Sequence, residues 1–293
     1  MYLETFKLPI DQEEGIIKSC TSRHRYIENI YPCGIMSENQ FHEINFADVT
    51  ILYGGNGSGK STVLNLIAEK LQLNRIAPYN SSDIFNAYVA ACKYKMAYDD
   101  EGFAQRVPNG SRIITSDDIF DYMLTVRTNN EDIREKEAMA DDKWLDLKFS
   151  DTIKLQGMED YEALRLQLLA KRKNLSRKGF IRKTAGEEVK LNSNGETAYF
   201  DTKLKNDTLY CLDEPENSLS PKMQIELVKL LETLSRYCGC QFVIATHSPF
   251  ILALQGARIY DLDETPVDLK NWCELENTRT YYEFFKKNER YFE

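Results

Sequence analysis

A short apolar run that leads directly into a glycine-rich turn and a helix is the feature that most restricts the fold of this chain. The run VTILY at 49–53 predicts a buried strand, and apolar residues at helical spacing over 62–71 predict the helix. The turn between them, GGNGSGKS, satisfies the pattern of one glycine, four residues and Gly-Lys-Ser. In this context backbone N–H groups and the helix N-terminus point at a phosphate. We therefore expect a phosphate-binding loop at the end of a strand.

Two side chains of this loop carry the chemistry of a nucleoside triphosphate site. Lys60 is expected to reach the β and γ phosphates, and Ser61 is expected to supply an oxygen ligand to Mg²⁺. The cofactors implied are ATP and Mg²⁺. The residues expected to contact the nucleotide are Gly55, Asn56, Gly57, Ser58, Gly59, Lys60, Ser61 and Thr62.

Two adjacent carboxylates follow another apolar strand, LYCL at 209–212. A phosphate loop that hydrolyses ATP also needs a carboxylate for the Mg²⁺ shell and a base for the attacking water. We expect Asp213 to orient the metal ion and Glu214 to polarise the water. The alternative is an acidic loop before the helix that begins at 221, where the helix dipole favours negative charge. The phosphate loop upstream makes the catalytic interpretation the stronger one.

A histidine follows a further apolar strand, 241–246, in the sequence ATHSP. His247 would then lie at the carboxyl edge of the sheet, where ligands of open α/β sheets bind. A histidine there can hydrogen-bond the γ phosphate, so we expect it to act with Lys60 and Glu214. A histidine at a strand end is more often structural, and only its position after the carboxylate strand reverses that preference.

The order of the predicted elements indicates an α/β fold with a mainly parallel sheet. Residues 1–53 are predicted as short extended pieces with turns, which form an N-terminal β subdomain. Residues 75–189 are more polar and are predicted as an inserted helical lid. The nucleotide-binding core would then comprise 1–74 and 190–293, within a single ATPase head of 293 residues.

Composition excludes several classes of protein. Of the residues, 42% are hydrophobic, and no apolar run reaches the length that crosses a membrane. The first residues are acidic where a secretory signal is basic. Seven scattered cysteines without paired spacing predict reduced thiols. We therefore expect a cytoplasmic protein without membrane contact.

One basic segment contrasts with the net charge of −9. Residues 165–190 contain nine Lys or Arg and two Glu, a charge density that suits contact with nucleic-acid phosphates. The alternative is a solvated helix, because the basic residues 171–173 end a predicted helix that begins with Glu159 and Asp160. The sequence favours the solvated helix without excluding nucleic acid as a partner.

Three blocks together resemble the ABC ATPase heads of the SMC, RecF and OLD-like group. They are residues 54–62, the block DEPEN at 213–217 and the block ATHSP at 245–249. The resemblance covers roughly 40–70 and 190–262, and it is greatest to small stand-alone ATPases of the group. It implies an ABC-type P-loop ATPase in which ATP brings two copies together.

The resemblance also implies a signature loop, typically of the form LSxGE, upstream of the acidic strand. The stretch LNSNGE at 191–196 is a degenerate match, since Asn192 stands where the family often has Ser. By resemblance, Ser193, Gly195 and Glu196 of one subunit would contact the γ phosphate held by the other. The alternative is an ordinary Asn-Gly turn.

Other elements of the family are less clear. The loop at 217–221 resembles the segment that crosses the dimer interface, with Ser220 where many relatives have His. The glutamine loop of the family cannot be placed. An aromatic that stacks on adenine is expected in the first 45 residues, and the candidates are Tyr26, Tyr31 and Phe41.

The resemblance implies an ATP-driven dimerising switch for a partner effector, in nucleic-acid transactions or phage defence. A separate effector is expected because the sequence shows no second catalytic group. The alternative is a regulatory module whose slow hydrolysis gates its affinity for a toxin or nuclease, although Glu214 favours turnover. The nucleotide-binding subunit of a membrane transporter fits less well, because the Glu-Pro-Glu-Asn block is SMC-like.

Overall fold

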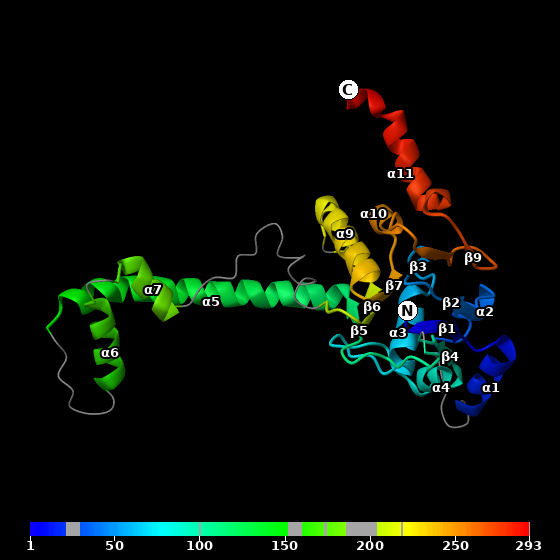
Figure 1. Cartoon of the computed structure of the whole chain (residues 1–293), viewed down its shortest axis with the longest axis horizontal. Helices are drawn as coiled ribbons and strands as arrows, with labels where there is room; N and C mark the ends of the chain where they lie inside the picture. Colours follow the sequence, from blue (N-terminus) through cyan, green and yellow to red (C-terminus); the bar gives the residue numbers. More distant parts are fainter. Residues whose placement is uncertain are drawn as a thin grey trace. The chain divides into compact units, whose positions relative to one another are not determined.

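The chain divides into two units, and the larger one is built around β-sheets (Figure 1). The structure is a computed structural model that describes residues 1–21, 30–99, 101–151, 160–172, 175–185, 204–217 and 219–292. The larger unit comprises Met1–Phe120 and Glu196–Glu293, and the smaller one comprises Asp121–Gly195.

The main sheet is mostly parallel and contains the strands that the sequence predicts. Its order is β5 (Arg112–Thr115), β6 (Leu209–Asp213), β7 (Gln241–Ala245), β3 (Val49–Tyr53), β8 (Arg258–Asp261) and β9 (Asp268–Leu269). Neighbouring strands pair in parallel except β8 and β9, which are antiparallel. Every residue of β3 and β7 is buried, as expected for strands covered on both faces. The α/β fold class with a mainly parallel sheet is confirmed.

A second, antiparallel sheet consists of β2 (Glu43–Asn45), β1 (Leu3–Lys7) and β4 (Lys93–Met96), in that order. The buried amide of Gln241 links it to the main sheet. Its Oε1 accepts hydrogen bonds from the backbone N–H groups of Tyr2 and Leu3, both at 2.8 Å. Its Nε2 donates to the carbonyls of Leu3 and Ala47. The amide is thus fully paired, which its burial requires, and the N-terminal β subdomain is confirmed.

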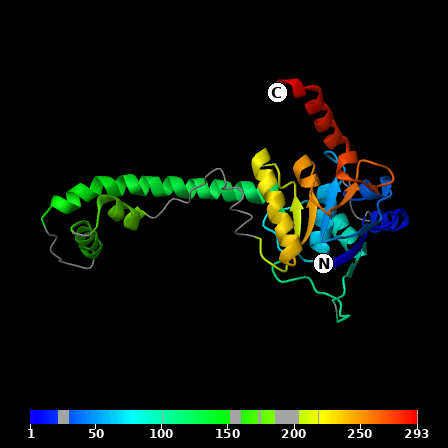
Figure 2. The ribbon, with the colours of Figure 1, turned by 45° about the horizontal axis from the view of Figure 1, so that its top comes forward.

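Helices cover both faces of the main sheet (Figure 2). α3 (Lys60–Lys70) contacts β5, β6 and β7, whereas α9 (Pro221–Tyr237) and α10 (Pro249–Leu252) contact each other. The connection through α3 runs from β3 toward the β5 edge of the sheet, whereas α9 connects β6 to β7 in the opposite direction. Because such crossovers are right-handed, the two helices lie on opposite faces. The residues that α9 buries follow helical spacing: Met223, Leu227, Leu231 and Leu234.

The N-terminal segment contains helices that the sequence analysis does not predict. Residues 1–53 are expected to be extended with a turn at Gly15, but residues 11–21 form α1 (Asp11–Thr21). A short helix, α2 (Ile35–Glu38), precedes β2. The prediction of purely extended pieces is therefore wrong for this segment, because contacts with distant residues outweigh the helix-breaking tendency of one glycine.

Glu14 is the side chain that holds α1 in place. It is 2% exposed, and its carboxylate accepts hydrogen bonds from Tyr88 Oη at 3.1 Å, Gly34 N at 2.8 Å and Ser37 Oγ at 3.1 Å. Tyr88 belongs to α4 (Asp83–Ala91), which packs against α1. One buried carboxylate therefore ties three segments of the larger unit together.

Replacing Glu14 with alanine should destabilise the larger unit by about 2–4 kcal/mol, because one buried and two partly buried donors lose their acceptor. The change in the free energy of unfolding can be measured by urea denaturation. The matched control is Glu13→Ala on the same helix, which removes a partly exposed pair with Lys93 and should cost less than about 1 kcal/mol. Equal effects of the two substitutions would contradict the role assigned to Glu14.

The helical insertion begins later than the sequence analysis predicts. Residues 75–120 are expected to belong to the lid, but they contain α4, β4 and β5, and both strands pair with strands of the larger unit. β4 is mostly exposed and β5 has four residues, so neither gives a clear buried-strand pattern. The boundary between the units lies after Phe120, not at residue 75.

The described part of the smaller unit is helical. It contains most of α5 (Ser116–Phe149), together with α6 (Asp160–Ala170) and α7 (Arg177–Ala185). Gln167 is fully buried on α6, and its Nε2 donates to Ser150 Oγ and to the carbonyl of Asp151, both at 2.8 Å. α5 is long enough to cross a membrane, but neither it nor any other helix within the described residues is sufficiently apolar to do so.

Basic side chains of the segment 165–190 have partners within the smaller unit. Arg177 forms a two-bond ion pair with Asp141, and Lys171 Nζ donates to the carbonyl of Ser150. The ion pair compensates part of the positive charge, and both contacts favour the solvated-helix interpretation over contact with nucleic acid. The residues of this segment that lie outside the described part are 173, 174 and 186–190.

Candidate functional site

The candidate site residues follow neighbouring parallel strands. The glycine-rich loop follows β3, Asp213 ends β6, and His247 comes after β7. Since β7 pairs in parallel with both β6 and β3, the three carboxyl ends lie side by side at one edge of the sheet. Open α/β sheets bind ligands at this edge. The topology therefore brings together residues that are far apart in the sequence.

The loop at 54–59 requires glycine where it enters α3. Gly59 has a φ of 96°, in the left-handed region, and is the N-cap of α3. A Cβ at Gly59 would lie 2.0 Å from Met36 Cε and 2.7 Å from Ile35 Cγ2. α2 thus packs directly against the loop. The buried hydroxyl of Ser58 has no partner among the described residues, and with the N–H groups of the first helical turn it can bind phosphate oxygens.

Lys60 is held inside the loop that precedes it. Its side chain is 4% exposed, and Nζ donates to the carbonyls of Gly54 at 2.7 Å and Gly55 at 2.9 Å. Nζ also lies 3.8 Å from Glu214 Oε1. A buried ammonium group therefore lies between the loop and a carboxylate, and its three donors can rotate toward phosphate oxygens.

Ser61 and Asp213 are joined directly, because Ser61 Oγ donates to Asp213 Oδ1 at 2.9 Å. Burial raises the pKa of Asp213 to about 6, and the hydrogen bond from Ser61 opposes that rise. A hydroxyl and a carboxylate are the oxygen ligands that Mg²⁺ uses, and a bound cation would favour the ionised carboxylate. The two residues therefore fit a Mg²⁺ ion shared with phosphates.

Glu214 is oriented by its backbone and by a neighbour. Its φ of 46° is in the left-handed region, which is uncommon for a residue with a side chain, and its N–H donates to the carbonyl of Ala245. Asn217 Nδ2 donates to Glu214 Oε2 at 2.8 Å. Oε1 remains 3.8 Å from Lys60 Nζ and 4.0 Å from His247 Nδ1. This oxygen can accept a proton from a water molecule, because the side chain is 24% exposed.

The backbone of His247 is held on both sides. Its N–H donates to Glu216 Oε1 at 2.9 Å, and its carbonyl accepts from Asn277 Nδ2 at 2.5 Å. The backbone N–H of Asn277 donates to Tyr53 Oη at 3.1 Å, and Tyr53 is the last residue before the loop. Asn277 lies in the first turn of α11 (Glu276–Lys287). It therefore connects the histidine, the strand of the phosphate loop and the C-terminal helix.

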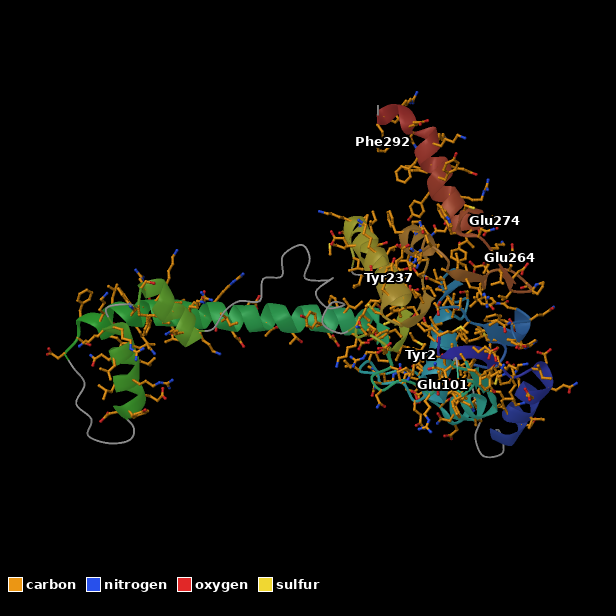
Figure 3. All side chains as sticks on the ribbon, viewed as in Figure 1. Tyr2, Glu101, Tyr237, Glu264, Glu274 and Phe292 are labelled. Carbon is orange, nitrogen blue, oxygen red and sulfur yellow. The ribbon has the colours of Figure 1, made fainter. Side chains whose placement is uncertain are left out.

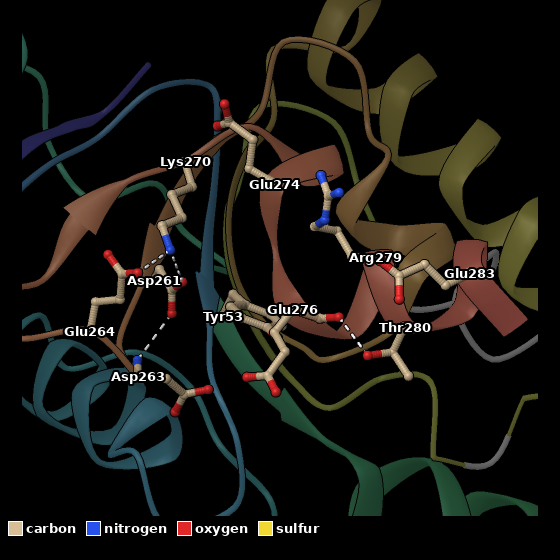
Figure 4. Close-up of a pocket in the computed structure, with 10 residues that line it drawn as sticks. All are labelled: Tyr53, Asp261, Asp263, Glu264, Lys270, Glu274, Glu276, Arg279, Thr280 and Glu283. Carbon is tan, nitrogen blue, oxygen red and sulfur yellow. Dashed lines mark hydrogen bonds and ion pairs between the residues drawn. The ribbon is translucent and has the colours of Figure 1, made fainter.

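Asp263 contacts the phosphate loop and is not among the residues expected from the sequence. The N–H of Gly55 donates to both carboxylate oxygens of Asp263, at 2.9 and 2.8 Å. Figure 4 shows Asp263 beside Asp261, whose carboxylate, with that of Glu264, pairs with Lys270. Asp263 follows β8 by two residues, so an acid just beyond a strand next to the loop strand was the available signal. Glu216, Asn217 and Asn277 were missed as well.

Several predicted residues are not at the site or cannot be placed there. Ser193, Gly195, Glu196 and Tyr26 lie outside the described residues. Phe41 is 3% exposed and packs against Tyr260, so it cannot stack on adenine. The ring of Tyr31 stacks on Phe85, and its hydroxyl donates to Thr62 Oγ1 at 3.2 Å. Among the described residues that were expected to stack on adenine, Tyr31 is therefore the one that lies next to the phosphate loop.

Part of the chain matches a known protein family. Residues 197–253 match the family described as "AAA domain, putative AbiEii toxin, Type IV TA system". One matching solved structure is cbiO1 from Clostridium perfringens, which is part of the ABC transporter complex cbiONQ. It is 16% identical in sequence, the match covers 83% of this chain and 88% of that chain, and the TM-score is 0.38. Another is the SMC head domain from Thermotoga maritima, with 15% identity, coverage of 78% and 92%, and a TM-score of 0.33. A search of curated proteins gives no match.

The matched segment contains the acidic block and His247 but not the glycine-rich loop. The main sheet places that loop, on β3, beside the matched block at one edge. The loop pattern, the sheet order with its additional antiparallel sheet and the family match all lead to the same architecture. That architecture is an α/β P-loop fold similar to the fold of ABC and SMC-head ATPases, and the family match covers residues 197–253 of it.

Proposed function

We propose that this protein binds Mg-ATP at the carboxyl edge of its main sheet and hydrolyses it. The observation that supports this most directly is the separation of two adjacent carboxylates. Asp213 bonds to Ser61, whereas Glu214 lies beside Lys60 and His247. One carboxylate is thus available to a metal ion and the other to a water molecule, and phosphoryl transfer to water uses both.

Each side chain then has its own task. Lys60 exchanges its two carbonyl partners for the β and γ phosphate oxygens, and Ser61 with Asp213 holds Mg²⁺. The metal ion supplies positive charge next to the phosphates. Glu214 takes a proton from water as the water oxygen bonds to the γ phosphorus and the bond to the β-phosphate oxygen breaks. His247 donates a hydrogen bond to the γ phosphate, and the products are ADP and phosphate.

ATP also brings two copies together in this proposal. Glu214 and His247 are 24% and 46% exposed, so one face of a bound γ phosphate would remain open to water. By resemblance, the segment 191–196 of a second copy closes this face with Ser193 and Gly195. Association is therefore linked to the nucleotide state, and the dimer acts as a switch for a separate effector.

The description of the matched family names a putative toxin and a type IV toxin–antitoxin system, which connects this proposal to toxin or defence biology but names no partner. We infer that the nucleotide state of this chain controls a partner from that biology. The alternative is a regulatory module that binds ATP with the same residues but turns it over slowly. The two differ in the rate of phosphate release, which the following assay measures.

Phosphate release from ATP should require Mg²⁺ and depend on Ser61. The wild-type chain should release phosphate with Mg²⁺ and stop in excess EDTA. Ser61→Ala removes a metal ligand and should lower kcat/KM by about tenfold or more at low Mg²⁺, with partial recovery at high Mg²⁺. The matched control, Ser235→Ala, removes a hydroxyl on α9 that donates to the carbonyl of Glu232 and should behave as wild type. Release that persists in EDTA would contradict the proposal.

A further inference from the structure

A groove of about 700 Å³ borders the proposed ATP site and lies between α9, α10 and α11. Its walls are mostly apolar, and they include Ile225, Trp272, Tyr281 and Phe285, which are 43–52% exposed. Exposed aromatic side chains continue beyond the groove to Phe292 at the end of the C-terminal helical segment (Figure 3). Exposed apolar patches mark sites of contact with proteins, membranes or ligands, and the continuation of this surface beyond the groove favours contact with a protein.

Two buried polar atoms of residues that line the groove have no hydrogen-bond partner among the described residues. They are Glu216 Oε2 and Thr278 Oγ1, and the two residues are 5% and 7% exposed. The other oxygen of Glu216, by contrast, accepts from Thr246 Oγ1 and from the N–H groups of His247 and Ser248. Buried polar atoms in folded proteins are rarely left unpaired. An occupant of the groove that supplies a donor would satisfy the carboxylate.

The charge of the groove restricts the chemistry of that donor. Glu216 is the only carboxylate among the described residues that line it, and no Lys or Arg lines it. The ring of His247, whose Nδ1 lies 3.5 Å from Glu216 Oε1, faces the oxygen that already has partners. A buried carboxylate is best paired with a cation, and aromatic rings such as Trp272 and Tyr281 attract a cation through their faces. We propose that the groove binds an apolar segment of the effector protein whose Arg or Lys side chain pairs with Glu216.

Two of the cations near the end of this helical segment have an aromatic partner. Lys286 Nζ lies 5.5 Å from the centre of the Tyr282 ring, and the guanidinium carbon of Arg290 lies 4.8 Å from that of Tyr291. These contacts show that aromatic side chains of this segment accept cations.

The position of the groove connects its occupancy to the nucleotide. His247 lines it, and Asn277 joins the carbonyl of His247 to Tyr53 before the phosphate loop. A segment bound in the groove therefore contacts the residue that is proposed to face the γ phosphate. This inference rests on the proposed function in one respect, because it takes the occupant to be the effector.

The test uses Trp272 as a reporter in the full chain without nucleotide. The sequence has two tryptophans, so Trp144→Phe leaves Trp272 as the only tryptophan, which can be excited selectively over tyrosine. The probes are three short helical Leu/Ala peptides with one central residue, which is Arg, norleucine or Glu. The Arg peptide should bind about tenfold more tightly than the norleucine peptide, and the Glu peptide should bind most weakly. Glu216→Gln should reduce the Arg preference to about twofold or less.

A matched pair of substitutions distinguishes binding in the groove from nonspecific hydrophobic binding elsewhere on the surface. Ile225→Asp places a charge in the groove and should weaken binding of all three peptides by about tenfold, whereas Ile76→Asp changes an isoleucine that is 72% exposed elsewhere and should leave binding unchanged. Equal affinities for the Arg and norleucine peptides, or equal binding by the two Asp variants, would overturn the proposal. So would self-association without peptide that Ile225→Asp removes, since the occupant would then be a second copy. The absence of nucleotide keeps this result independent of ATP hydrolysis.

Discussion

Replacing Lys60 with alanine should lower the affinity for ATP by at least about 100-fold, which leaves no binding detectable at ordinary protein concentrations. The physical reason is the position of the ammonium group, which is 4% exposed and bonded to two carbonyls of the phosphate loop. A cation that is already desolvated and confined next to the loop interacts strongly with the β and γ phosphates. Alanine leaves the triphosphate charge opposite carbonyls and the carboxylates of Glu214 and Asp213.

Calorimetry with Mg-ATP measures this effect on the intact chain. The matched control is Lys70→Ala in the last turn of the same helix, where Nζ donates to the carbonyls of Val89 and Ala90. That control should keep its nucleotide affinity within about twofold, because it changes a helix end far from the loop. Unchanged affinity in Lys60→Ala would refute the assignment of the phosphate loop as the nucleotide site.

Replacing Glu214 with glutamine should stop hydrolysis while ATP remains bound. Glutamine keeps the size of the side chain and its hydrogen bond with Asn217, but it removes the base, so kcat should fall by about 100-fold or more. Because the product state is not reached, ATP-bound dimers should accumulate. Light scattering with ATP and Mg²⁺ should therefore show a dimer for Glu214→Gln and a monomer without nucleotide.

A second substitution in the same chain tests whether the dimer has a composite site. Adding Ser193→Arg places bulk and charge at the proposed contact with the γ phosphate of the other copy, and should return the trapped dimer to monomer. The control is Thr233→Arg, which adds the same side chain at an exposed position of α9 and should leave the dimer intact. The composite-site mechanism is wrong if Glu214→Gln stays monomeric with ATP, or if Ser193→Arg leaves the dimer unchanged. The assignment of the ATP site within the single chain would stand after either outcome.

The sequence by itself determined the parts of the molecule whose geometry is local. The phosphate loop at 54–61 was predictable because its strand, glycines and helix are consecutive in the chain. The strands before Asp213 and before His247 were predictable because central parallel strands are apolar on both faces. α9 was predictable from Pro221 at its start and from the helical spacing of its apolar residues.

Tertiary structure alone decided which of the distant residues meet. The sequence could not reveal that Glu14 binds α2 and α4, that Asp263 holds the N–H of Gly55, or that Asn277 joins His247 to Tyr53. The residues of β4 and β5 were predicted from the sequence to belong to the lid, although both strands pair with strands of the larger unit. The physical reason is the same in each case. A polar side chain or a short exposed strand takes its role from partners far along the chain, and such partners leave no periodic pattern around it.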